Sequence, residues 1–386
     1  MPPRQRAYIN PKLLVWGREQ SSLTLEAAAR RIHVSPEKLL AWESDADKPT
    51  IKQLRKAARV YHLSLAIFYL QEPPWLYQPI RDYRRIFGAA QETLSPELAI
   101  EIRQAHDRRD VAAELYAELE ETPPDFGLRI SAGDDPETVG EQIRGYIGVQ
   151  LETQRRWRDS SVAFREWRLA FERRGILVFQ ASGIDLDEMR GFSIGDSHLP
   201  VIVVNRTDAY AARVFTLIHE VAHLGLRDVG LCNLAETGSQ SRELQRIETF
   251  CNRVAGAALV PRAALLGHGE VADHPGTRWA PKELDPIARE FKVSRQVIIR
   301  RLLTLGRTNQ AAYDVAMEAM YEEFRSIPRR AGGFLAPPEN TLSLVGRLYT
   351  KLALSAYHQN RIGPAALSDF LGVRLKHLPA LEQIAV

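Results

Sequence analysis

Apolar residues recur at helical spacing along most of this chain, and only a few short stretches have the composition of strands. From residue 10 to 72 the pattern predicts five short helices. Thr24 can cap a helix over residues 25–32, and Ser35, followed by Pro36, can cap the next one. The turn between these two helices predicts a helix-turn-helix unit.

A small sheet is predicted in the middle of the chain, between helical regions. Pro73 and Pro74 end the first unit, long helices are expected over 75–121, and a helical stretch follows over 136–174. Strands are predicted at 176–181 and 200–205, with a third candidate at 189–194. Farther along, a loop with solvated histidines is expected over 268–276, and helical pairs at 284–303 and 363–381. We expect both pairs to pack on the rest of the protein rather than to read DNA.

Composition and charge are those of an ordinary globular protein. With 386 residues and 45% hydrophobic content, the chain can bury the cores of two or three domains. No apolar run approaches the roughly 18 residues that span a bilayer, and no secretory core is present, so we expect a cytoplasmic protein without a membrane partner. Two cysteines are too few for a disulfide framework. Residues 1–72 hold 12 Lys/Arg against 7 Asp/Glu in a chain of net charge +3, so the basic bias lies at the amino end.

Residues 219–223 read His-Glu-Val-Ala-His inside an apolar run, and this spacing is typical of zinc hydrolases. Two imidazoles four residues apart on a helix lie about 5–6 Å apart at Cβ, so both rings can reach one metal ion. Glu220 then flanks the open side of the metal, where a carboxylate can take a proton from a bound water. The motif indicates a ligand role for His219 and His223 and a catalytic role for Glu220.

The helical phase of the run supports this interpretation. At about 100° per residue, His219 and His223 point almost opposite to an apolar stripe. The stripe consists of Val214, Leu217, Ile218, Val221, Leu224 and Gly225. It can be buried while the imidazoles face a cleft.

A hydrolytic zinc site needs a third protein ligand, and the candidates lie downstream of the motif. Leu226 and Val229 stand where a metzincin carries Gly and His, which excludes that subclass. Glu248 is favoured, because it opens a run of small residues over 248–261 that can form a second helix close to the first. The competing ligands are Asp228, Cys232, Glu236, Glu243 and Cys251. A thiolate would make the site more structural and less hydrolytic.

The amino-terminal unit resembles the XRE-type helix-turn-helix of phage-repressor-like regulators over about fifty residues. The resemblance rests on residues 23–29, Val34-Ser35-Pro36, Trp42-Glu43 and Lys48-Pro49-Thr50. The helix over 36–43 offers Glu37 and Lys38 as base readers, and outward cations could contact phosphates. The candidate DNA-binding residues are Glu37, Lys38, Lys48, Lys52 and Arg55. A dimerisation or target-docking module is the alternative, because Leu25 replaces a common Gln and His33 the usual turn Gly.

The block from Phe171 to Pro261 resembles the ImmA/IrrE family of metallopeptidases, through the predicted strands, the motif helix and the run that begins at Glu248. The resemblance implies that His219, His223 and Glu248 hold zinc and that Glu220 is the base. It also implies cleavage of a helix-turn-helix repressor, which derepresses genes of stress responses or mobile elements. Two His and a Glu also accept Mn²⁺ or Fe²⁺.

These patterns predict an α+β, predominantly helical protein. It comprises an amino-terminal helix-turn-helix bundle, a zincin-like domain with a small mixed or antiparallel sheet and the HExxH helix, and a carboxyl-terminal helical region. The expected divisions are an XRE-type module over 1–74, a helical connector over 75–135, the metallopeptidase domain over 136–265, an extension with helix-turn-helix spacing over 266–330, and a helical segment over 331–386.

Two functional classes follow. The first is a zinc-dependent endopeptidase whose substrate is a helix-turn-helix repressor and whose amino-terminal module guides it to double-stranded DNA or to a DNA-bound target. The second is a DNA-binding transcriptional regulator in which the metal domain is sensory or structural. Glu220 favours the first class, because a structural zinc needs no base beside it. A homodimer is compatible with either.

Overall fold

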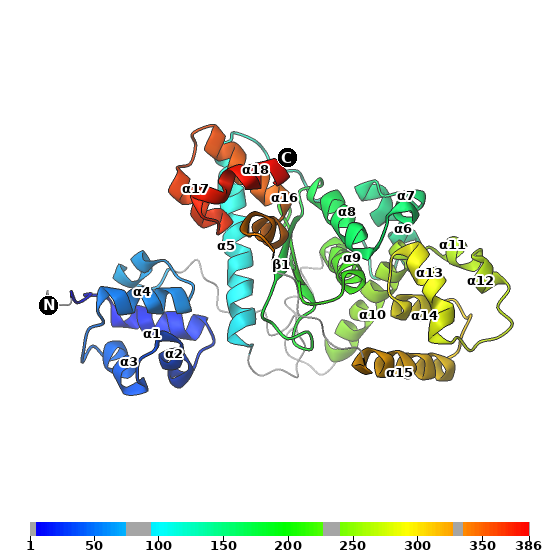
Figure 1. Cartoon of the computed structure of the whole chain (residues 1–386), viewed down its shortest axis with the longest axis horizontal. Coiled ribbons are helices and arrows are strands. Elements are labelled where there is room, and N and C mark those ends of the chain that lie inside the picture. The colour runs from blue at the N-terminus through cyan, green and yellow to red at the C-terminus, as the bar shows by residue number, and fades with distance from the viewer. Residues whose placement is uncertain (1–4, 75–93, 227–239, 327–334, 386) are drawn as a thin grey trace. The chain divides into compact units, whose positions relative to one another are not determined.

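The computed structural model of the chain describes residues 5–74, 94–226, 240–326 and 335–385. It divides into two compact units, Met1–Asp107 with Gly183–Met189 and Arg108–Ser182 with Arg190–Val386. Helices make up most of both units, and the described residues form one three-stranded sheet (Figure 1). The predicted fold class, predominantly helical α+β with a small mixed sheet, is confirmed. No helix within these ranges is both long enough and apolar enough to cross a bilayer.

The first unit begins with a bundle of short helices. Thr24 Oγ1 accepts the Ala27 N–H at 3.2 Å, and Ser35 Oγ accepts the Lys38 N–H at 3.3 Å, so both predicted caps are confirmed. His33 ends the second helix in the left-handed conformation, with φ 63°. The fifth predicted helix is a 3-10 helix. The elements are α1 (Pro11–Gln20), α2 (Leu25–Ile32), α3 (Pro36–Glu43), α4 (Ile51–Val60) and η1 (Leu65–Tyr69).

The region between the bundle and the sheet is helical only in part. α5 (Pro96–Glu118) is its long helix, and residues 119–135 contain no helix. Pro123 and Pro124 disfavour one there, because proline lacks an amide proton and clashes with the preceding helical turn. The expectation of long helices over 75–121 is therefore confirmed for α5 and wrong for residues 119–121, while residues 75–93 lie outside the described ranges.

The sheet has the order β1-β3-β2, with β1 (Leu177–Ala181) parallel to β3 (Val201–Asn205) and β2 (Gly191–Ile194) antiparallel to β3. All three predicted strands are present. Every residue of β1 and β3 is buried, whereas burial alternates along β2. That alternation is typical of a strand with one covered face, and β2 forms one edge of the sheet.

Helices pack around this sheet and around one another. α9 contacts β2, β3, α8 and α10, and α10 also packs on α6 (Figure 1). Gly140 on α6 allows α6 and α10 to pack this closely, since a Cβ at that position would lie 2.7 Å from the Ala258 nitrogen. The elements are α6 (Pro136–Ile147), α7 (Leu151–Arg156), α8 (Ser160–Glu172), α9 (Tyr210–Leu226) and α10 (Gln240–Leu259).

The remaining helices include both predicted pairs. α14 buries Val297, Ile298, Ile299, Arg301 and Leu302, so it packs against its neighbours as expected. The elements are α11 (Arg262–Leu266), α12 (Gly269–Ala272), η3 (Pro281–Glu283), α13 (Leu284–Phe291), α14 (Arg295–Thr304), α15 (Gln310–Ser326), α16 (Pro337–His358), α17 (Pro364–Leu371), η4 (Leu375–His377) and α18 (Leu378–Ala385).

The predicted loop over 268–276 contains α12, and its histidines are not solvated. His268 Nε2 lies 3.2 Å from Glu290 Oε2, and the His274 ring stacks on Trp279 with centroids 3.6 Å apart. Both side chains are only 11–12% exposed. The expectation of solvated histidines is wrong, because a neighbouring helix and an aromatic ring cover them.

Candidate metal centre

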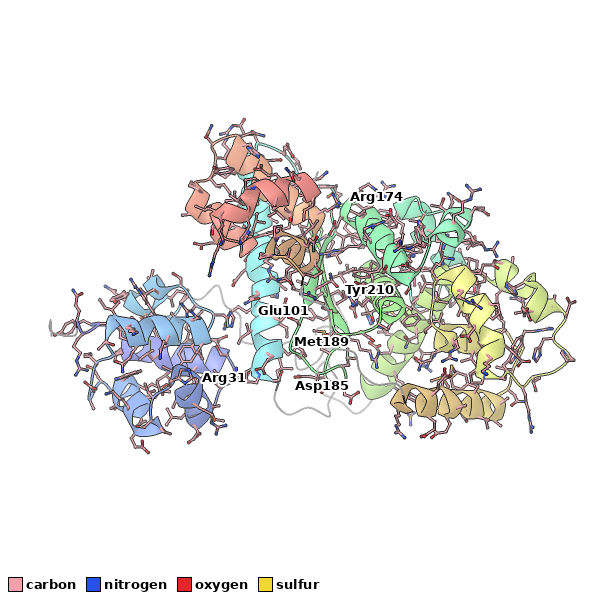
Figure 2. The ribbon with its side chains drawn as sticks, in the orientation of Figure 1. Arg31, Glu101, Arg174, Asp185, Met189 and Tyr210 are labelled. Atoms are coloured by element: carbon pink, nitrogen blue, oxygen red, sulfur yellow. The ribbon has the colours of Figure 1, made fainter. Side chains whose placement is uncertain are left out.

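The motif lies on α9, which starts at Tyr210 (Figure 2). His219 and His223 project from the side of the helix away from its buried stripe, with 14% and 25% of their side chains exposed. Glu220 is buried, at 8% exposure. All six stripe positions predicted from the helical phase are buried: Val214, Leu217, Ile218, Val221, Leu224 and Gly225. Burial of this stripe fixes the rotation of α9, and therefore the direction of the imidazoles.

Glu248 comes from α10, which packs directly on α9. The expectation that Glu248 opens its helix is wrong, because α10 begins at Gln240, about two turns earlier. Glu248 is therefore held within a continuous helix, whose close packing on α9 brings a carboxylate from a distant part of the sequence to the two imidazoles.

The three side chains converge on one point. His219 Nε2 and His223 Nε2 lie 3.0 Å apart, Glu248 Oε2 lies 3.4 Å from His219 Nε2, and Glu248 Oε1 lies 3.2 Å from His223 Nε2. Donor atoms that surround a tetrahedral zinc at its usual bond lengths are separated by about 3.3 Å. The two carboxylate oxygens of Glu248 each face one imidazole, and one donor atom from each of the three residues forms a triangle whose corners all lie within 4.8 Å of one another. A modest adjustment of the Glu248 rotamer would bring three such atoms around a tetrahedral ion. Two His and one Glu are also a donor set of hydrolytic zinc sites, in which a fourth position is left for water or substrate.

The electrostatics of the cluster favour a positive charge at its centre. Burial opposes protonation of His223, but hydrogen bonds to Cys251 and Glu248 and the charge of Glu220 raise its pKa to about 11. Burial acts to raise the pKa of Glu248, yet its hydrogen bonds to His219 and His223 hold it far below the usual range. A cation bound among these atoms would take the place of the proton that the facing nitrogens otherwise share.

Glu220 is held from the other side by β2. Ser193 Oγ donates a hydrogen bond to Glu220 Oε2 at 2.8 Å. Gly191 allows β2 to approach α9 this closely, because a Cβ there would collide with Thr216 and lie 2.9 Å from the Val203 carbonyl oxygen. The sequence offered one signal for Ser193, its place two residues after a glycine in a predicted strand, but nothing linked that strand to Glu220.

Among the competing ligands, only Cys251 has a described side chain, and it does not join this group. Cys251 is buried on α10 and is hydrogen-bonded to His223, but it lies outside the group of donor atoms that are all within 4.8 Å of one another. The side chain of Glu243, and all of Asp228, Cys232 and Glu236, lie outside the described residues. Within the part of the chain that the structure describes, no sulfur completes the triangle.

The candidate DNA-binding residues divide between two helices of the first unit. Glu37 and Lys38 are exposed on α3. Lys52 and Arg55 are exposed on α4, and Lys48, between these helices, forms an ion pair with Asp45. The structure therefore does not gather all five on one helix face.

Comparisons with known proteins locate two families in the chain. Residues 171–303 match the IrrE N-terminal-like domain of peptidase family M78, and residues 16–68 match the helix-turn-helix family HTH_3. No curated protein matches the chain. Among solved structures, a Mycobacterium tuberculosis transcriptional regulator is similar at 18% identity over 53% of this chain and 52% of that protein, with a TM-score of 0.31. This chain thus spans about half the length of that regulator.

The first family match runs from α8 through the sheet, α9 and α10 to α14, and so includes His219, Glu220, His223 and Glu248. The second covers the helix-turn-helix between α2 and α3. The resemblances stated from the sequence are confirmed. The chain therefore carries a helix-turn-helix domain at residues 16–68 and an IrrE N-terminal-like domain of peptidase family M78 at residues 171–303.

Proposed function

We propose that this protein is a zinc-dependent endopeptidase that cleaves a helix-turn-helix transcriptional repressor. The observation that carries the proposal is the triangle of donor atoms from His219, His223 and Glu248, with the carboxylate of Glu220 beside it. A purely structural zinc site needs no base next to the metal, whereas hydrolysis of a peptide bond does. The M78 family match supports the same reaction class.

In this proposal His219, His223 and Glu248 would hold zinc, which would supply Lewis-acid activation of a water molecule. Glu220 is the general base. Its Oε2 accepts the Ser193 hydroxyl, and Oε1 has no hydrogen-bond partner among the described residues, so Oε1 is the atom that takes the proton from the attacking water. The same carboxyl group then delivers that proton to the leaving amide nitrogen.

We propose that the substrate lies as an extended strand along β2. The Asn205 N–H donates to the Arg190 carbonyl at 2.7 Å, so by antiparallel alternation the backbone groups of Gly191 and Ser193 point away from β3. These residues also face Glu220, so a strand added there would lie next to the base.

A repressor is the substrate class that best matches the combination of two domains in one chain. A helix-turn-helix module can hold the peptidase on DNA, where a DNA-bound repressor is locally concentrated. We propose double-stranded DNA as the second partner and assign the module to residues 1–74. The peptidase domain is assigned to residues 136–265. Residues 75–135 are the connector, residues 266–330 an extension whose part up to residue 303 falls within the matched family domain, and residues 331–386 the terminal helices.

The deciding experiment compares Glu220→Gln with the unchanged protein. The substrate is a helix-turn-helix repressor encoded next to this chain, and the readouts are fragments on a gel and metal per protein chain. We expect wild-type zinc content, because the amide keeps the hydrogen bond to Ser193, and a loss of cleavage of about 10²- to 10⁴-fold. Glu141→Gln, an exposed change on α6, is the matched control and should leave both readouts unchanged. Equal cleavage by Glu220→Gln and wild type would refute the proposal and favour the regulator with a sensory or structural metal domain.

A further inference from the structure

Exposed cations of the first unit gather along α4. The helix carries Lys52, Arg55, Lys56 and Arg59 and contains no acidic residue. At about 100° per residue these side chains fall within about 100° of arc, opposite the buried positions of the helix. Lys52, Arg55 and Arg59 are exposed. Among the residues that the structure describes, none of the four cations forms an ion pair, and we call them the α4 stripe.

The outward face of α3 is chemically different. Leu40 is 53% exposed there, beside the exposed carboxylate of Glu37. Asp45 and Asp47 follow the helix, where Asp45 pairs with Lys48 and Asp47 pairs with Arg6. Because these charges are already paired within the unit, a phosphate backbone at the end of α3 would meet no excess of positive charge. An exposed leucine, moreover, cannot form hydrogen bonds with base edges. The favourable potential for a polyanion therefore lies along α4 rather than α3.

We propose that the first unit binds double-stranded DNA through its phosphates, by the α4 stripe, and that α3 does not read the base sequence. The inference rests on the DNA-binding role proposed above. From Lys52 to Arg59 the helix rises about 10 Å. Duplex DNA carries about six phosphate charges over that length, so three or four simultaneous contacts are geometrically accessible.

The quantity to measure is the binding of the full-length protein to fluorescein-labelled 24-base-pair duplexes, by fluorescence anisotropy between 50 and 200 mM NaCl. Two duplexes of equal composition and shuffled sequence are compared. Three or four phosphate contacts predict a slope of log K against log salt of about −3, which is a loss of affinity of about 40- to 150-fold over this range. The two duplexes should bind with equal affinity, because phosphate contacts carry no sequence information.

Two triple variants locate the surface. Lys52→Gln/Arg55→Gln/Arg59→Gln removes three charges from the α4 stripe and leaves Lys56, and we expect at least a tenfold loss of affinity and a slope between zero and about −1. Lys12→Gln/Arg30→Gln/Arg31→Gln removes three exposed charges elsewhere in the same unit and should change affinity less than threefold. All six positions are exposed, and circular dichroism with thermal melting verifies that both variants remain folded.

Three outcomes overturn the inference. An equal loss in both triple variants would mean that no particular helix is used, and a tenfold preference for one duplex would mean that bases are read. Displacement of the DNA by polyglutamate at equal charge concentration would indicate an acidic protein as the partner. If the wild-type protein binds no DNA at 50 mM NaCl, the proposed DNA-binding role fails as well, whereas metal-dependent cleavage is measured separately and stands or falls on Glu220.

Discussion

The buried ion pair of Arg168 and Glu172 is expected to hold α16 on the sheet domain. Arg168 Nε lies 3.0 Å from Glu172 Oε1, with side-chain exposures of 8% and 4%. Arg168 also donates to the Ser343 carbonyl at 2.7 Å, and Glu172 Oε2 accepts the Arg347 N–H at 3.1 Å. Both contacts flank Gly346, whose φ of 79° interrupts the helical backbone of α16. The pair therefore supports the backbone on each side of that break.

Arg168→Met leaves the Glu172 carboxylate buried with backbone donors only. Removing one partner of a buried pair costs about 3–5 kcal/mol. Burial already raises the pKa of Glu172, and the attraction of Arg168 opposes that rise, so the variant carboxyl should take up a proton more readily. Replacing both residues by methionine removes the unpaired charge, and the double variant should therefore lose less stability than the sum of the single variants.

Thermal and urea unfolding of the single and double variants measure these costs. At about 2–4 °C per kcal/mol for a domain of this size, Arg168→Met should lower Tm by about 6–20 °C. Arg165→Met on the same helix is the matched control, because its guanidinium is 60% exposed and its ion pair with Glu166 contributes less than about 1 kcal/mol. The reasoning fails if both arginine variants lose the same stability, or if the costs of Arg168→Met and Glu172→Met are simply additive.

Three further predictions concern the metal centre and the helix that precedes the sheet. Ser193→Ala should reduce kcat roughly 10- to 100-fold at unchanged zinc content, because Glu220 loses a hydrogen bond. Ser193→Thr keeps the hydroxyl and should retain activity. Full activity of the alanine variant would contradict this role of Ser193. Chelation should lower Tm, and added zinc should restore it. At a free zinc concentration one hundred times the dissociation constant, the free energy of unfolding should rise by about 2.7 kcal/mol, whereas calorimetry of His223→Ala should show no zinc-dependent shift in Tm. Asp159 caps α8, and its hydrogen bond with Ser161 holds the pKa of Asp159 well below the usual range. The stabilisation that the ionised Asp159 cap gives α8 should be complete above about pH 4 and should vanish as pH falls through that lowered pKa. Asp159→Ala should therefore lower Tm at pH 7 but not in strong acid.

Features that depend on neighbouring residues were predictable from the sequence. Thr24 and Ser35 cap helices because a side-chain oxygen reaches an amide three residues away. The direction of His219 and His223 followed from the apolar stripe of the same helix, since 3.6 residues per turn fix which positions share a face. The motif chemistry and the three strands could likewise be derived from short-range pattern alone.

The tertiary structure decided what no local pattern encodes. Sequence spacing left Glu248 among six acidic or thiol candidates, and only the packing of α10 on α9 brings its oxygens within 3.4 Å of both imidazoles. Ser193 reaches Glu220 because β2 is the edge strand beside α9, a position that depends on strand order and not on strand composition. The pairing of the charges at the end of α3, which leaves the α4 stripe as unpaired cations among the described residues, is also a property of the folded bundle. Local hydrogen bonds and helical periodicity act within a few residues, whereas convergence of distant side chains depends on how whole elements pack.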